Sequence, residues 1–174
     1  MQDADLFMEL AAIAGVFVGF GALIAVRSGG VSDTFEVAYV RGVVSAGLLA
    51  IVAALAPVTL ARYTLTDHEV WMASSAVVLV GLAAVIAINM LTPEYWEDAT
   101  GRVRTTFPRW LIAIVMVVVG LLLLAIVLAP ITIILGLAPE LEGALYFTAV
   151  VLTLLWAAWL LLQMVFRGRR PAAA

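Results

Sequence analysis

One stretch decides the fold of this chain: WLIAIVMVVVGLLLLAIVLAPITIILG, residues 110–136. It runs for 27 residues without a charged side chain, and Thr132 is its one clearly polar residue. As a helix rising about 1.5 Å per residue it would span roughly 40 Å, which exceeds the ~30 Å hydrocarbon core of a bilayer. A water-soluble domain has no use for such a helix, so the stretch predicts an integral membrane protein.

The rest of the chain repeats this pattern. Of its 174 residues, 66% are hydrophobic, and the polar stretches between the apolar runs are too short to form a second domain. We therefore predict an all-α fold, a single transmembrane bundle of five helices over residues 1–174. The predicted spans are 6–26, 42–61, 70–91, 110–136 and 143–166, and a short interfacial helix is predicted at 93–99.

Arginine positions predict the orientation. Lysine is absent, and the nine arginines divide eight to one between the two sets of segments that the five spans separate. Because cytoplasmic loops carry the excess of positive charge, the N-terminus is expected outside and the C-terminus in the cytoplasm, in the cell (inner) membrane. The larger set is Arg27, Arg41, Arg102, Arg104, Arg109, Arg167, Arg169 and Arg170, and Arg62 is alone on the other side.

The sequence contains no enzyme motif. His-Glu-x-x-His, Gly-x-Ser-x-Gly and a phosphate-binding loop are all missing. Cysteine is absent and His68 is the only histidine, so one chain cannot assemble a metal or haem site. Nothing forms a basic face for nucleic acid. We predict no enzymatic activity and no cofactor, and the lipid bilayer is the first partner.

Small residues mark two helix faces. Bilayer lipid gives no hydrophobic drive for helix association, so close backbone approach is what stabilises a contact there. One interpretation is that the first two spans pack together inside the bundle, and the alternative is that two copies associate through Gly15 and Gly19. The stripes are Ala11, Gly15 and Gly19 in the first span and Gly42, Ala46 and Ala50 in the second.

Glu9 is the ionisable side chain placed deepest in a predicted span, about one turn in. Arg62 ends the second span on the same side of the membrane, so the two form a candidate ion pair. The alternative is that each side chain reaches water by itself. Glu9 also shares a face with Ile13, Val16 and Phe20, away from Ala11.

Trp156 and Trp159 fall in the middle of the last span, and Gln163 lies on the same face. An indole N–H at that depth has no water and needs a partner. The face is a candidate contact for another subunit or a bound small molecule. The favoured interpretation is that these are aromatic residues of the bundle interior or the lipid surface that bond a backbone carbonyl.

Three runs are similar to a family of small bacterial multi-pass membrane proteins without an established function. They are residues 11–23 (AAIAGVFVGFGAL), residues 52–58 (VAALAPV) and the reversal 137–141 (LAPEL). The resemblance implies a multi-pass membrane fold over most of the chain and implies no activity or site residue.

These features favour a structural or accessory subunit of a homo- or hetero-oligomeric membrane assembly, with other membrane subunits or copies of itself as partners. A small homo-oligomeric ion channel or transporter is the alternative. No ionisable group lies at mid-membrane, which argues against a proton relay within one chain.

Overall fold

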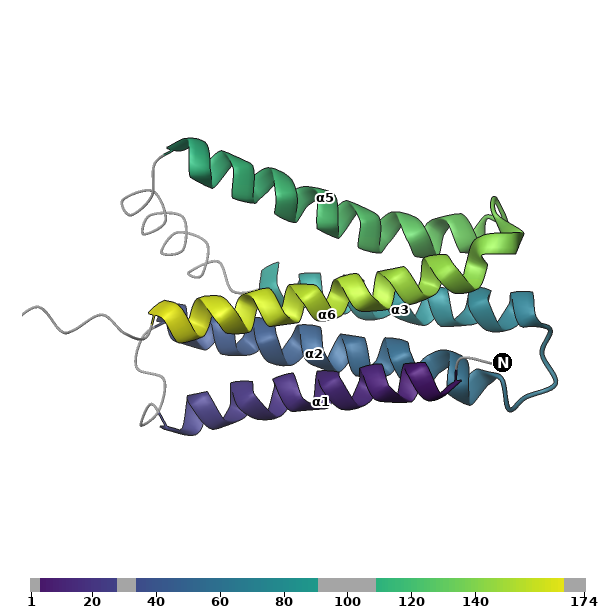
Figure 1. Ribbon diagram of the computed structural model, residues 1–174, viewed down its shortest axis with the longest axis horizontal. Coiled ribbons are helices and arrows are strands. Elements are labelled where there is room, and N and C mark those ends of the chain that lie inside the picture. The colour runs from purple at the N-terminus through teal and green to yellow at the C-terminus, as the bar shows by residue number, and fades with distance from the viewer. Residues whose placement is uncertain (1–3, 28–33, 91–108, 168–174) are drawn as a thin grey trace, which may run out of the picture.

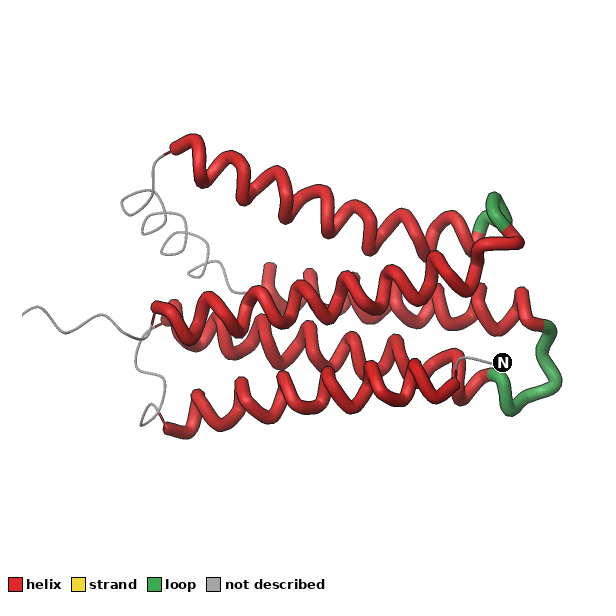
Figure 2. Tube along the Cα trace, in the orientation of Figure 1, coloured by secondary structure: helices red, strands yellow, loops and turns green. Residues whose placement is uncertain are grey.

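The computed structural model describes residues 4–27, 34–90 and 109–167, and in this part of the chain it is all-helical (Figures 1 and 2). Five long helices lie lengthwise beside one another, and consecutive helices run in opposite directions. They are α1 (Ala4–Arg27), α2 (Thr34–Leu60), α3 (Asp67–Met90), α5 (Arg109–Ile134) and α6 (Glu142–Arg167), and a short 3-10 helix, η1 (Pro139–Leu141), precedes α6.

All five helices are long and apolar enough to cross a membrane. Each predicted span overlaps one of them almost completely, so the all-α fold with five membrane-length helices is confirmed. The short helix predicted at 93–99 lies outside the described residues. The placement of the termini on either side of a membrane stays a prediction.

Local sequence explains where these helices begin and end. Before α3, the Thr66 backbone N–H donates to Glu69 Oε2 at 2.7 Å, and the Glu69 N–H faces Thr66 Oγ1 at 3.4 Å. This is a capping box, which satisfies backbone donors that the first helical turn leaves free. At the other end of α5, Gly136 has φ +64° and the Leu137 N–H bonds the Thr132 carbonyl, which closes the helix as a Schellman turn.

Helix α2 is the centre of the bundle and packs against α1, α3 and α6. Helix α5 lies at the edge, against α3 and α6, and Figure 1 shows it closest to α6 near its Ile134 end. The interior is built from small side chains that let backbones approach closely. Five alanines there are at most 1% exposed: Ala14, Ala50, Ala53, Ala54 and Ala157.

Helix α1 packs on α2 through a line of residues spaced by seven, Phe7, Ala14 and Gly21. The tightest point of this contact belongs to a glycine of α2, because a Cβ built on Gly47 would lie 2.5 Å from Val18 Cγ2. The first two spans therefore do pack together, as predicted.

The predicted α1 stripe is wrong as the surface of that contact. Ala11 is half-buried against the core, but Gly15 and Gly19 are exposed, and a Cβ added to either would meet nothing within 4 Å. The physical reason is angular: Gly15 is one residue beyond Ala14 and so lies about 100° further round the helix. The stripe instead faces away from the rest of the chain.

The α2 stripe lies inside the bundle. Ala46 and Ala50 are buried, and Ala50 packs with Ala14 of α1 and Leu154 of α6. A Cβ added to Gly42 would lie 3.2 Å from Leu160 of α6. These small residues thus let α2 approach α1 and α6 at the same time.

Candidate functional site

Polar groups meet inside the bundle where α2, α3 and α6 come together. Pro57 has no N–H, so the carbonyl of Ala53, four residues earlier, lacks its usual helical donor. Tyr146 of α6 supplies one instead: its hydroxyl donates to the Ala53 carbonyl over 2.7 Å, in a fully buried setting. The carbonyl that the proline leaves free is thereby matched by a tyrosine 93 residues beyond Ala53 in the chain.

Ser74 of α3 joins this group, and Ser75 follows it in the same helix. Ser74 lies beside the Tyr146 hydroxyl, and Ser74 and Ser75 are both fully buried. Neither Oγ is in hydrogen-bonding geometry with any described group. We call Ala53, Pro57, Ser74, Ser75 and Tyr146 the Tyr146 cluster.

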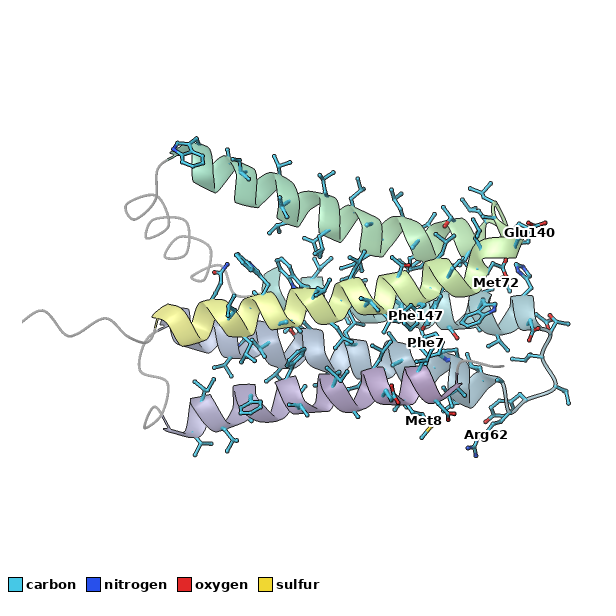
Figure 3. All side chains as sticks on the ribbon, in the orientation of Figure 1. Phe7, Met8, Arg62, Met72, Glu140 and Phe147 are labelled. Atoms are coloured by element: carbon cyan, nitrogen blue, oxygen red, sulfur yellow. The ribbon has the colours of Figure 1, made fainter. Side chains whose placement is uncertain are left out.

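Aromatic rings pack beside this cluster. Phe7 contacts Trp71, Tyr146 and Phe147 at centroid separations of 6.1, 6.0 and 5.8 Å, and Trp71 lies 5.5 Å from Tyr146. Figure 3 shows Phe7 and Phe147 near the same end of the bundle. A Cβ on Gly143 would lie 3.3 Å from Trp71, so the first turn of α6 is packed directly on the indole. The rings join α1, α3 and α6.

A hydrogen bond between a histidine and a carboxyl group lies at the same end. His68 Nδ1 is 2.7 Å from Glu142 Oε1, which joins the first turn of α3 to the first residue of α6. The Glu142 side chain is 6% exposed and that of His68 is 50% exposed, so the pair reaches from the interior to the surface. The N-terminus of α6 also favours a carboxylate at this position, because free N–H groups give it positive character.

The predicted pairing of Glu9 with Arg62 is not formed. Both residues are exposed, and no ion pair joins these two described side chains. Arg62 points away from the helices (Figure 3). The prediction failed because it used depth alone: ending on the same side of the membrane does not bring two side chains within reach.

Trp156, Trp159 and Gln163 lie on a face of α6 that points partly into the chain. Leu152, one turn earlier on this face, packs against a core formed by α2, α3 and α5. Trp156 and Gln163 are half-buried, and Trp159 is 38% exposed. The structure therefore leaves Trp159 as the most open member of this predicted partner face.

The outward side of α1 differs from that of the other helices. It combines the open glycines Gly15 and Gly19 with a strip that carries the Glu9 carboxylate and the exposed residues Val16 and Phe20. No described part of the chain covers this side.

Within residues 4–27, 34–90 and 109–167, no three His, Asp or Glu side chains gather as metal ligands would. A surface hollow of about 240 Å³ lies at the turn formed by residues 138–141, away from both the Tyr146 cluster and the outward side of α1. The Tyr146 cluster holds hydroxyls and a carbonyl, which bind small neutral hydrogen-bonding groups.

Sequence reasoning missed the Tyr146 cluster and the His68–Glu142 pair. Pro57 was a usable signal for the first, because a proline inside a helix always frees the carbonyl four residues earlier. The identity of the donor was not readable, since Tyr146 is far away in sequence. His68 and Glu142 are 74 residues apart and give no local signal.

The arrangement defines an all-α protein with five helices of membrane-crossing length and a closed interior, in which two open glycines and the Glu9 carboxylate lie on the outward side of α1. No family model, curated protein or solved structure matches the chain. The resemblance of residues 11–23, 52–58 and 137–141 to small bacterial membrane proteins thus stays a prediction.

Proposed function

We propose that this chain is a non-enzymatic subunit of a larger assembly in the cell membrane, and that it contacts its partner through the outward side of α1. The observation that carries the proposal is the open pair Gly15 and Gly19. The partner is another copy of the chain or a different membrane subunit.

Glycine in a helix interior costs roughly 1 kcal/mol relative to alanine, and on a face with no neighbour nothing offsets that cost. Between membrane helices, small residues four apart allow two backbones to meet closely and are enriched at contacts. A second helix packed on Gly15 and Gly19 would therefore offset the cost of these glycines, which the single chain does not do.

The neighbouring strip on α1 supports the same conclusion. Glu9 is exposed there and makes no ion pair with Arg62, which is also exposed. A carboxylate below the surface of a bilayer is stabilised by a partner group. An incoming helix that carries a donor opposite Glu9 would provide one.

The proposed orientation places the N-terminus outside and the C-terminus in the cytoplasm. Among the described residues, Arg27, Arg109 and Arg167 lie at helix ends on one side of the bundle, Arg41 lies in the part of α2 nearer that side, and Arg62 follows α2 on the other side. The positive-inside rule assigns the first side to the cytoplasm.

Photo-crosslinking in the native membrane tests the contact. Benzoylphenylalanine replaces Phe20, which is 53% exposed on α1, and Trp110, which is 64% exposed on α5, as a matched aromatic control. Crosslinking from position 20 to one protein, this chain or another, and its absence at position 110 are expected. Lipid adducts alone at both positions would contradict the proposal.

A measurement of ion flux distinguishes the proposed subunit from the alternative, a channel or transporter. Purified protein in liposomes is expected to leave a potassium or proton gradient intact, because the helices enclose small, tightly packed side chains. A selective flux from the pure protein would replace the subunit function with that of a homo-oligomeric channel or transporter.

A further inference from the structure

Two buried serines behave unlike the other helical hydroxyls of the described chain. A serine or threonine inside a helix can donate to the carbonyl three or four residues earlier, which satisfies it locally. Ser74 and Ser75 do not, although both are fully buried. Five others do so, at distances of 2.7 to 3.2 Å: Ser45, Thr59, Thr132, Thr148 and Thr153.

Burying a hydroxyl without a partner is unfavourable, and the cost is greatest where no water reaches it. The carbonyls of the preceding helical turn could accept a hydrogen bond from either serine, but neither hydroxyl donates to them. Ser74 lies beside the Tyr146 hydroxyl of α6, and Ser75 is the next residue of α3.

The chemistry around the serines selects a neutral, very small ligand. Glu142, the buried carboxylate among the described residues, is already hydrogen-bonded to His68. The other polar groups of the cluster are the Tyr146 hydroxyl and the Ala53 carbonyl, which bond each other. Hard cations prefer more oxygen ligands than this, often including carboxylates.

Size restricts the ligand further. The neighbours Ala53, Val78 and Val150 are at most 2% exposed and belong to one packed cluster with Tyr146. Rings of Phe7 and Trp71 pack against Tyr146 on another side. A group of several atoms does not fit between such neighbours, whereas a water molecule needs only two to four polar partners and about its own volume.

We propose that Ser74 and Ser75 form an internal water-binding site, and that water held by Ser74 contacts the Tyr146 hydroxyl. The site joins α3 to α6 at the level of the Pro57 position in α2. It is independent of the α1 contact and of the proposed assembly.

Radiolytic labelling read by mass spectrometry tests the site, since hydroxyl radicals formed from a bound water oxidise the buried side chain beside it. In the wild-type protein Tyr146 is expected to be labelled although it is fully buried, and Tyr63, which is 69% exposed, serves as the internal standard. In Ser74→Ala the Tyr146 signal should fall several-fold relative to Tyr63. Ser45→Ala, which removes a hydroxyl bonded to its own helix, should leave it unchanged.

Thermal unfolding gives a second readout that does not depend on labelling. If the serines bind water, Ser74→Ala with Ser75→Ala lowers the melting temperature, because hydrogen bonds are lost. A dry site predicts the opposite sign, since the substitutions then remove unsatisfied hydroxyls. An unlabelled Tyr146 in the wild type, or a melting temperature of the double variant equal to or above that of the wild type, would overturn the proposal.

Discussion

The hydroxyl of Tyr146 donates to the carbonyl of Ala53, the group that Pro57 deprives of its backbone donor. The bond is 2.7 Å long and buried between α2 and α6. The hydrogen bond that α2 lacks within itself is thereby replaced by a contact between α2 and α6, because the free carbonyl of α2 accepts from a side chain of α6. The central helix and the last helix are thus fixed at a defined register.

Tyr146→Phe tests this relationship. The substitution keeps the ring in place but leaves the Ala53 carbonyl buried without a donor, which should cost about 1–3 kcal/mol of unfolding free energy. Pro57→Ala restores a backbone N–H four residues after Ala53. In that background the cost of Tyr146→Phe should therefore shrink, as chemical denaturation in detergent would measure. An equal cost in both backgrounds would show that the two residues are not coupled.

Gly47 and Gly15 should respond to alanine with opposite signs. At Gly47 the new Cβ would lie 2.5 Å from Val18 Cγ2, a stiff β-branched side chain, so about 1–3 kcal/mol of stability should be lost. In the single chain, separated from any partner, the Cβ at Gly15 meets nothing, and the better helix propensity of alanine should add up to ~1 kcal/mol. Melting temperatures of the two detergent-solubilised variants decide this. An equal loss of stability in both variants would show that the α1–α2 contact is not the one described.

The hydrogen bond between His68 and Glu142 at the start of α6 predicts an ordering of variants. His68→Ala leaves the Glu142 carboxylate buried without its partner, and about 1–3 kcal/mol of stability should be lost. Glu142→Gln should cost less, because a neutral amide still bonds the imidazole and carries no buried charge. Adding His68→Ala to Glu142→Gln should then have a smaller effect than His68→Ala in the wild type. Additive effects in the double variant would contradict a direct interaction.

The chain contains no cysteine, so single cysteines report topology without background. Asp67→Cys and Glu140→Cys, both at exposed positions, should react with a membrane-impermeant thiol reagent added to sealed cells. Thr105→Cys should react only after the cells are opened. Labelling of Thr105→Cys in sealed cells would reverse the proposed orientation.

The sequence alone was sufficient to predict the helices, but it was insufficient to predict which face of each helix packs against its neighbours. Uninterrupted apolar length marks a membrane-crossing helix, and a capping box such as that of Thr66 and Glu69 marks its start, because both are local properties. Which side of α1 is covered depends on α2. Two lines of small residues run along α1, one through Ala14 and Gly21 and the other through Gly15 and Gly19. Only the contact with Gly47 of α2 shows which line is covered.

The mass distribution of the gently extracted protein tests the assembly most directly. Native mass spectrometry of the wild type should show this chain bound to further copies or to another subunit. The double variant Gly15→Leu with Gly19→Leu should run as a single chain, because bulky side chains would hold a second helix away from α1. Gly120→Leu, at a glycine of α5 that is equally exposed and equally open, should keep the wild-type mass. A wild-type protein that is found as a single chain without a bound partner would contradict the proposed assembly.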